Sequence, residues 1–96
     1  MTAVTKDISA ENIFTDNISP IYNNPSGTLN LSITGTWEGT VTLQRSFDEG
    51  ENWYDVDEFT SNIQTSLVDY ELGVRYRAGI KTSDYTSGTA SVRLSK

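Results

Sequence analysis

Three carboxylates, Asp55, Asp57 and Glu58, form the cluster in this 96-residue chain that could perform acid–base catalysis or bind calcium. Calcium needs about six to eight oxygen ligands converging from a suitable loop, and glycoside hydrolysis needs a pair of carboxylates across a substrate cleft. A small domain has little room for such a cleft. The chain also has no Cys and no His, which removes thiolate chemistry, the commonest general base and the commonest metal ligand. We therefore expect no enzymatic activity, no cofactor and no metal site.

Charge is polarised along the chain. Residues 38–71 contain nine acidic residues and one Arg, a net charge of −8, whereas residues 72–96 contain five basic residues and one acidic residue, a net charge of +4. The whole chain carries a formal charge of −6. This value disfavours nucleic acid as a partner, because affinity for the phosphate backbone comes largely from Lys and Arg.

The basic residues of the last third are expected on the outward faces of their strands. They are Arg75, Arg77, Lys81 and Arg93. If their strands pair, these side chains form one basic stripe, for which two hypotheses stay open. The stripe binds an acidic surface of another subunit, or it pairs internally with the carboxylate cluster on a neighbouring strand of the same sheet.

Apolar and polar residues alternate from Thr28 onward, which is typical of strands with one buried face. The predicted strands cover residues 28–34, 40–47, 53–56, 63–70, 74–81 and 89–94. Turns are predicted between Gly35 and Gly39, at residues 48–52, and at Gly73 and Gly88. Phe47 and Val56 are expected to point into the core. No segment has the spacing of an amphipathic helix over more than one turn. We therefore expect a single all-β domain, an antiparallel sandwich of about seven strands.

Residues 1–27 differ from the rest, because their large apolar side chains do not alternate regularly. These are Ile8, Ile13, Phe14, Ile18, Ile21 and Tyr22. The segment is an edge strand with loops that cover an open end of the sandwich, or an arm that contacts other subunits; residues 28–96 are the sandwich domain. The first residues lack the layout of a signal peptide, and no apolar run is long enough for a membrane helix. We expect synthesis in a cytoplasm and no membrane partner.

The sequence of residues 46–53, SFDEGENW, fits the S-x-D-x-G-x-x-W pattern of the Asp-box found in sialidase-like propellers. Propellers need several copies, and one copy in 96 residues cannot make one. We therefore expect a structural turn. Asp48 should cap backbone N–H groups, Gly50 should take a positive φ, and Trp53 should pack across the hairpin.

The sequence of residues 70–76, YELGVRY, is similar to the L-x-P-G-x-x-Y segment of fibronectin type III domains, a resemblance that extends over residues 28–94. Gly73 and Tyr76 match that pattern, whereas Tyr70 and Leu72 stand in place of Leu and Pro. The resemblance implies an immunoglobulin or fibronectin type III-like sandwich. It also implies that Tyr76 is a buried tyrosine corner whose hydroxyl bonds to the backbone of residues 70–73. Trp37, by contrast, is expected in a short turn flanked by Gly.

Residues 35–48, 53–56, 76–79 and 84–89 together resemble small β-sandwich proteins from the structural gene clusters of tailed bacteriophages. The resemblance implies a structural virion protein, a capsid decoration or cement protein above all, whose partners are capsid or tail subunits or further copies of itself. The candidate interface is formed by the six apolar residues of segment 1–27 and the four basic residues of the stripe. The alternative is a carbohydrate-binding or adhesive module of a tail fibre or cell-surface protein. Its available stacking surfaces are Trp37, Trp53, Tyr54 and Tyr85.

Overall fold

The computed structural model describes residues 2–96, and in these residues it contains eight strands and no helix. The strands are β1 (Ala3–Ile8), β2 (Ile13–Phe14), β3 (Thr28–Gly39), β4 (Val41–Ser46), β5 (Tyr54–Phe59), β6 (Ile63–Val68), β7 (Arg75–Ile80) and β8 (Tyr85–Ser95). The prediction of an all-β domain is confirmed. The count exceeds the predicted seven because residues before Thr28 supply two strands. Within the described chain, no helix is therefore present that could cross a membrane.

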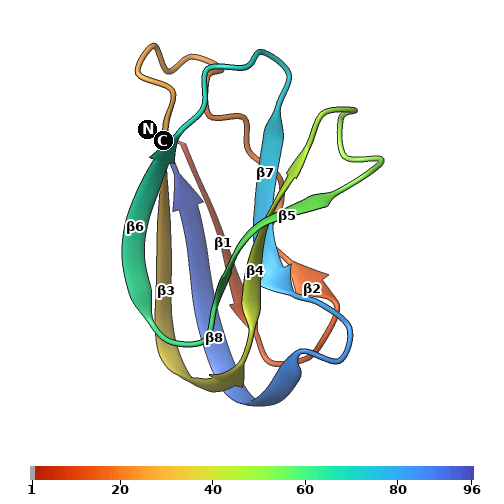
Figure 1. The fold of residues 1–96 in the computed structure, drawn as a ribbon. Helices are drawn as coiled ribbons and strands as arrows, with labels where there is room; N and C mark the ends of the chain where they lie inside the picture. The colour runs from red at the N-terminus through yellow and green to blue at the C-terminus, as the bar shows by residue number, and fades with distance from the viewer. Residues whose placement is uncertain (1) are drawn as a thin grey trace.

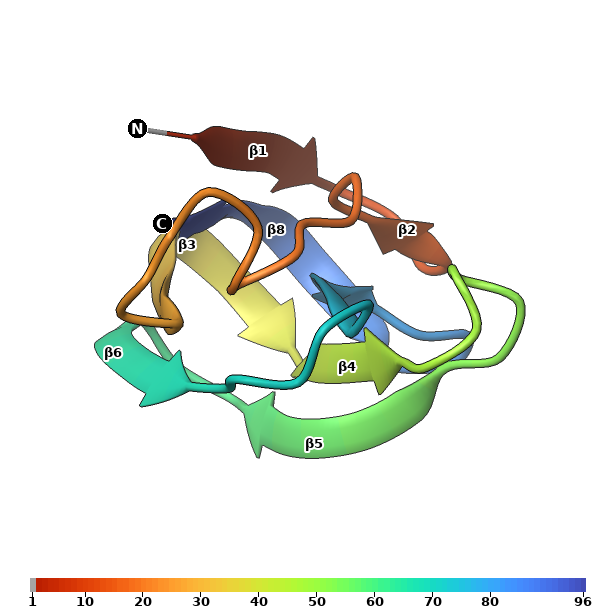
Figure 2. The same cartoon turned by 90° about the horizontal axis from the view of Figure 1, so that it is seen from above.

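The strands form two antiparallel sheets, an arrangement that fits a β-sandwich (Figures 1 and 2). Sheet A has the order β1-β8-β3-β6, and sheet B has the order β2-β7-β4-β5. β8 lies inside sheet A, paired with β1 on one side and with β3 on the other. The free edges are therefore β1 and β6 in sheet A, and β2 and β5 in sheet B. β5 and β6 end their sheets on the same side of the molecule, opposite β1 and β2 (Figure 2).

β3 continues through the region where the sequence predicts a turn. Gly35 and Trp37 are strand residues paired with β8, so the predicted turn between Gly35 and Gly39 is wrong. The chain crosses from sheet A to sheet B between β3 and β4. At this corner Gly39 has a φ of 146°, and a Cβ would lie 2.4 Å from the carbonyl oxygen of Asp84. Glycine fits here because it has no Cβ and tolerates this backbone conformation.

Other strand limits also differ from the prediction. The last strand begins at Tyr85, so Gly88 lies inside β8 opposite Trp37 and marks no turn. β6 ends at Val68, two residues before the predicted limit of 70. Gly73 does lie in the turn that precedes β7. The long pairing of β3 with β8, from Asn30 to Gly39, overrides the local turn preference of glycine in the middle of both strands.

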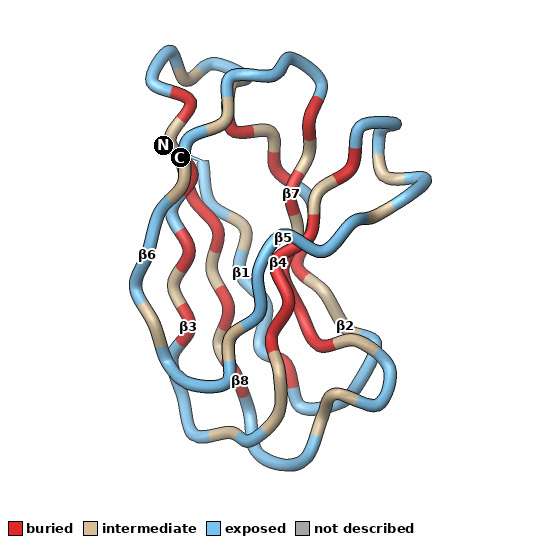
Figure 3. The backbone as a smooth tube through the Cα atoms, viewed as in Figure 1, coloured by how far each residue is buried: buried red, intermediate tan, exposed pale blue. Residues whose placement is uncertain are grey.

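The core lies between the two sheets (Figure 3). Its buried apolar side chains are Ile8, Ile18, Leu29, Leu31, Ile33, Val41, Leu43, Val74, Tyr76, Ala78, Ile80, Ala90, Val92 and Leu94. Phe47 and Val56, expected to point inward, are 51% and 40% exposed. Phe47 follows the last residue of β4, and Val56 is the extra residue of a β-bulge, since Leu43 pairs with Asp57 and Gln44 with Asp55. A bulge re-aims the side chain that it inserts.

Residues before Thr28 belong to both sheets. β1 pairs with β8 over its whole length, β2 pairs with β7, and Ile18 forms a bridge with Tyr76. Ile8 and Ile18, which the sequence places in the candidate interface, are thus buried in the core of this chain. β2 approaches β7 closely, because a Cβ at Gly79 would lie 2.1 Å from the carbonyl oxygen of Ile13. The absence of a side chain at Gly79 lets β2 dock.

Candidate binding surfaces

Arg77 lies between two aromatic rings on the outer face of sheet B. Its guanidinium carbon is 3.9 Å from the centre of the Phe14 ring and 4.4 Å from the centre of the Trp53 ring. Cation–π attraction favours this stack, and burial lowers the pKa of Arg77. β2 supplies Phe14, and the turn between β4 and β5 supplies Trp53, so the stack ties three segments of the chain together. Trp53 packs on Arg77 of β7, a contact that the Asp-box pattern does not predict.

A chain of hydrogen bonds continues from Arg77 across sheet B. Arg77 Nε donates to Gln44 Oε1 at 2.9 Å, and Gln44 Nε2 donates to Asp55 Oδ1 at 2.9 Å. Lys81 Nζ donates to Asp55 Oδ2 at 2.7 Å. The hydrogen bond from Lys81, followed by that from Gln44, lowers the pKa of Asp55, and the same pairing raises the pKa of Lys81. Internal pairing with the carboxylate cluster therefore holds for Lys81.

The four basic residues do not form one stripe. Arg75 and Arg77 lie on β7 and Lys81 follows it in sheet B, whereas Arg93 lies on β8 in sheet A. The predicted stripe is wrong because it requires these strands to pair, as in the fibronectin arrangement. Arg75 Nη1 donates to Asn17 Oδ1, and Arg93 Nη1 donates to Ser95 Oγ, both at 3.0 Å.

The three carboxylates of the cluster all lie on β5. Asp55 is engaged by Gln44 and Lys81, and Asp57 Oδ1 accepts the backbone N–H of Glu58 at 2.8 Å. Among residues 2–96, no group of three or more His, Cys, Asp or Glu side chains is arranged to hold a metal ion.

The Asp-box segment forms a closed turn. Ser46 Oγ donates to Asp48 Oδ1 at 2.7 Å and accepts the backbone N–H of Gly50 at 2.9 Å. Asp48 Oδ1 also accepts the backbone N–H of Asn52 at 2.9 Å. The hydrogen bond from the Asn52 backbone, with those from the side chains of Ser46 and Asn52, lowers the pKa of Asp48 to about 2. Gly50 has a φ of 93°, so its conformation is one that favours glycine.

Tyr76 is buried with 2% exposure, and its hydroxyl donates to Asp69 Oδ2 at 2.8 Å. The partner is a side-chain carboxylate just after β6, and the predicted backbone acceptor within residues 70–73 is wrong. Asp69 Oδ1 in turn accepts the backbone N–H of Glu71 at 2.9 Å. Burial, followed by the hydrogen bond to Asp69, raises the pKa of Tyr76. The tyrosine thus fastens the β6–β7 connection to the core.

A hollow of about 410 Å³ lies at the end of the sandwich where Thr2 and Lys96 pair through their backbones. We call it the terminal groove. The apolar and basic side chains that define it are Ile21, Tyr22, Leu72, Arg75 and Lys96. Tyr22 is 69% exposed and Leu72 is 83% exposed. Lys96 Nζ lies 5.3 Å from the Tyr22 ring centre, donates to the carbonyl oxygen of Ser19 at 2.7 Å and also to that of Tyr22.

The terminal groove brings together four predicted interface residues, Ile18, Ile21, Tyr22 and Arg75, although Ile18 is buried beneath it. Ile13 and Phe14 lie on β2, and Arg77 and Lys81 lie on or directly after β7, so these four residues belong to or adjoin sheet B. The sequence reasoning missed Leu72 and Lys96. An apolar residue beside Gly73 in a turn is a usable signal for Leu72, whereas no sequence signal identifies Lys96.

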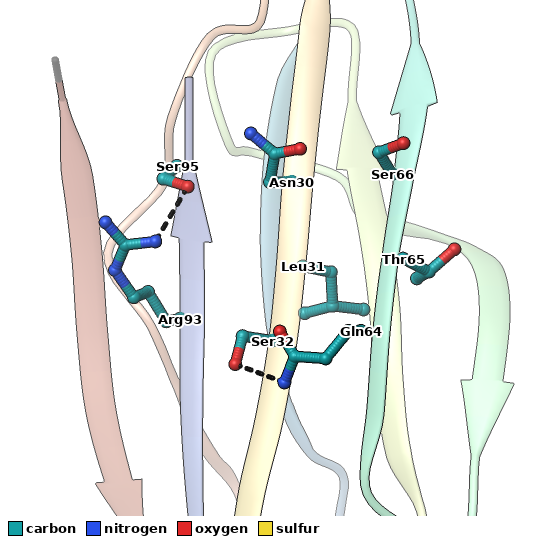
Figure 4. Close-up of a pocket in the computed structure, with 8 residues that line it drawn as sticks. All are labelled: Asn30, Leu31, Ser32, Gln64, Thr65, Ser66, Arg93 and Ser95. Carbon is teal, nitrogen blue, oxygen red and sulfur yellow. Dashed lines mark hydrogen bonds between the residues drawn. The ribbon is translucent and has the colours of Figure 1, made fainter.

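A second hollow, of about 380 Å³, is polar and lies on the outer face of sheet A, over β8, β3 and β6 (Figure 4). Gln64 Nε2 on β6 donates to Ser32 Oγ on β3 at 2.8 Å. Arg93 is the cation among the lining side chains, and its guanidinium contacts Ser95 as described above. The aromatic residues of the carbohydrate hypothesis are dispersed, with Trp37 Nε1 donating to Asn62 Oδ1 at 2.8 Å and Trp53 held on Arg77.

No protein-family model matches the chain, and neither a curated protein nor a solved structure matches it.

Proposed function

We propose that the chain is a structural protein of a tailed-bacteriophage particle that attaches to other virion subunits, with capsid decoration or cement as its role. The observation that carries the proposal is the terminal groove, an apolar surface with cations at its border. The resemblance to phage structural proteins supplies the biological setting. Its partners are then capsid or tail subunits.

The chemistry of the terminal groove suits a protein partner. Covering one large apolar side chain stabilises a complex by about 1.5 to 3 kcal/mol, and Tyr22 and Leu72 both offer this surface. Arg75 and Lys96 complement carboxylates on a partner, which favours encounter and fixes orientation. The groove also joins residues distant in sequence, so binding there depends on the folded domain.

We also infer a distant relationship to immunoglobulin and fibronectin type III sandwiches. The support is the buried Tyr76 that follows Gly73 at the start of β7, in the position that the motif gives to its corner tyrosine. The position of β8 between β1 and β3 departs from that arrangement.

The experiment uses particles of the phage whose genome encodes the chain. Mass spectrometry of purified particles should detect it in stoichiometric amounts, and particles that lack it should rebind the purified protein. Leu72→Glu and Arg75→Glu should weaken rebinding at least tenfold, and added salt should weaken the wild type because it screens exposed charges. Tyr54→Glu, at a 56% exposed aromatic on β5, is the matched control and should rebind normally. A chain that is absent from particles would contradict the proposal.

Carbohydrate binding remains the second candidate, favoured by one observation. Phe47 and Tyr54 are both exposed, with ring centres 6.2 Å apart, and Arg45 lies 5.1 Å from the Phe47 ring. Sugars stack on such rings. A glycan array would support this candidate if Tyr54→Ser abolished a signal that Leu72→Glu left unchanged.

A further inference from the structure

β6 is the least protected of the four sheet edges in the described chain. It runs for six residues, IQTSLV, and contains no charge, no Pro and no Gly. It pairs with β3 at every position without a register shift. β1 carries Lys6 and Asp7, β2 has two residues, and β5 is bulged and acidic. Charges, shortness and bulges are the features that block strand addition, and β6 has none of them.

The outer edge of β6 exposes a defined set of backbone groups. Asp69 N–H donates to the carbonyl oxygen of Gly27 at 3.0 Å, and hydrogen-bonded pairs alternate along an antiparallel ladder. With the observed register of β3 and β6, the N–H and C=O groups of Gln64, Ser66 and Val68 face away from β3. Within residues 2–96, β6 pairs with β3 alone, so these groups are available to another strand.

An apolar cavity of about 140 Å³ lies beside this edge, between β6 and β5. Its apolar walls are formed by Leu29, Leu31, Leu43, Val56, Phe59 and Leu67. A strand added to β6 would turn every second side chain toward this cavity. Small apolar side chains are the ones that would fill it.

The charges around the cavity decide the chemistry of the occupant. β5 carries three carboxylates and no basic residue, and Asp57 lines the cavity. A second copy is disfavoured, because two antiparallel β6 strands related by a two-fold axis place both sandwiches on the same side of the joined sheet. The acidic β5 strands would then face each other. A basic segment would be attracted by the carboxylates of β5, whereas a second copy would be repelled by them.

We propose that β6 and the adjacent cavity bind an extended segment of a partner protein that carries small apolar side chains and a Lys or Arg on the same face of the strand. The segment adds to sheet A as a fifth strand, its apolar side chains enter the cavity, and its cation, on the same face of the strand, lies near Asp57. This deepens the proposed function by naming a second contact and the chemistry of its partner. It differs from the terminal groove in position and in the charge that it selects.

The test uses the full chain labelled for NMR and two peptides with the length of β6. In the Val–Lys peptide every second position is Val or Lys and the positions between are Ser, and the Val–Glu peptide has Glu in place of Lys. The Val–Lys peptide should protect the amides of Gln64, Ser66 and Val68 from hydrogen exchange. The Val–Glu peptide should bind at least about tenfold more weakly, which corresponds to about 1.4 kcal/mol. Equal affinities, or no protection of these amides, would overturn the proposal.

Variants locate the site. Ser66→Pro removes an outward N–H and should abolish peptide binding. Thr65→Lys, on the cavity side of the same strand, should also abolish it while keeping every N–H. Thr36→Lys, an exposed position of β3 paired with β8, is the control and should bind normally. If both β6 variants fold, as judged by NMR spectra, and still bind, the proposal is wrong.

Analytical sedimentation tests the alternative in which a second copy of the chain occupies the β6 edge. A wild-type dimer that protects the same amides and that Ser66→Pro dissociates would assign the edge to a second copy and overturn the basic partner.

Particle rebinding distinguishes the failure of this proposal from the failure of the proposed function. If the chain is present in particles but does not bind the Val–Lys peptide, only the strand site is refuted. If the chain binds the peptide but is absent from particles, only the proposed function is refuted.

Discussion

Tyr76→Phe removes one hydroxyl from the core and leaves the ring in place, so it isolates the hydrogen bond to Asp69. The donor is buried, the acceptor is a half-buried carboxylate, and the atoms are 2.8 Å apart. Hydrogen bonds to charged groups contribute about 1.5 to 3 kcal/mol. Asp69 can take up water after the change, so we expect a loss near the lower end, about 1.5 kcal/mol. For a domain of this size that corresponds to about 6 to 12 °C in Tm.

The stability difference between wild type and Tyr76→Phe should also depend on pH in alkaline solution. The pKa of Tyr76 is raised above 10.0, first by burial and then by the hydrogen bond to Asp69. A raised folded-state pKa means that the contribution of Tyr76 is fully present below pH 10.0 and is lost as pH rises through the folded pKa. The difference between wild type and Tyr76→Phe should therefore shrink above that pH.

Urea unfolding at neutral and alkaline pH measures both effects. Tyr70→Phe is the control, because Tyr70 is 66% exposed and its change should stay within about 0.5 kcal/mol of wild type. A Tyr76→Phe protein as stable as this control, with unchanged alkaline sensitivity, would refute the reasoning.

Three further changes test other parts of the fold. Asp48→Asn should abolish the acid sensitivity of stability that Asp48 contributes. A pKa lowered from 3.8 to about 2 in the folded protein gives stability that is lost as pH falls through that interval. Thermal melts of both proteins at pH 4 and pH 2 measure the difference. Gly79→Ala should displace β2 and cost about 1 to 3 kcal/mol, seen as faster exchange of the Thr15 amide, which donates to the Ala78 carbonyl oxygen; an unchanged rate would argue against close docking of β2. Arg77→Lys should cost about 1 kcal/mol, because an ammonium loses planar stacking between Phe14 and Trp53, and Trp53 fluorescence should shift.

The alternation of apolar and polar residues predicted the fold class, because it indicates which face of each strand is buried. Leu29, Leu31 and Ile33 on β3, and Ala90, Val92 and Leu94 on β8, are buried as that pattern predicts. Strand order was not predictable in this way. The pairing of β8 with both β1 and β3 depends on contacts between residues far apart in sequence, and alternation has the same appearance whichever strand is the neighbour.

The candidate site was partly predictable for the same reason. Tyr22 and Arg75 stand out in sequence as an apolar residue outside any alternation and as an outward cation. Leu72 and Lys96 meet these two residues because their segments lie at the same end of the sandwich. The sequence does not show at which end of the sandwich a segment lies. Asp69 as the partner of Tyr76 was missed because the fibronectin motif points to backbone acceptors, whereas a carboxylate seven residues earlier reaches the hydroxyl.

The interior position of β8 also governs the order in which the two sheets can form. Among the eight strands, β1 comes first in sequence, yet its partner β8 comes last, and β3 lacks one of its two neighbours until β8 pairs. Sheet A therefore closes only when β8 is in place, while the pairing of β4, β5 and β7 in sheet B does not depend on β8. Such non-local closure slows folding and leaves apolar edges open to aggregation in the meantime. Production at reduced temperature, or with chaperones, is expected to raise the yield of folded protein.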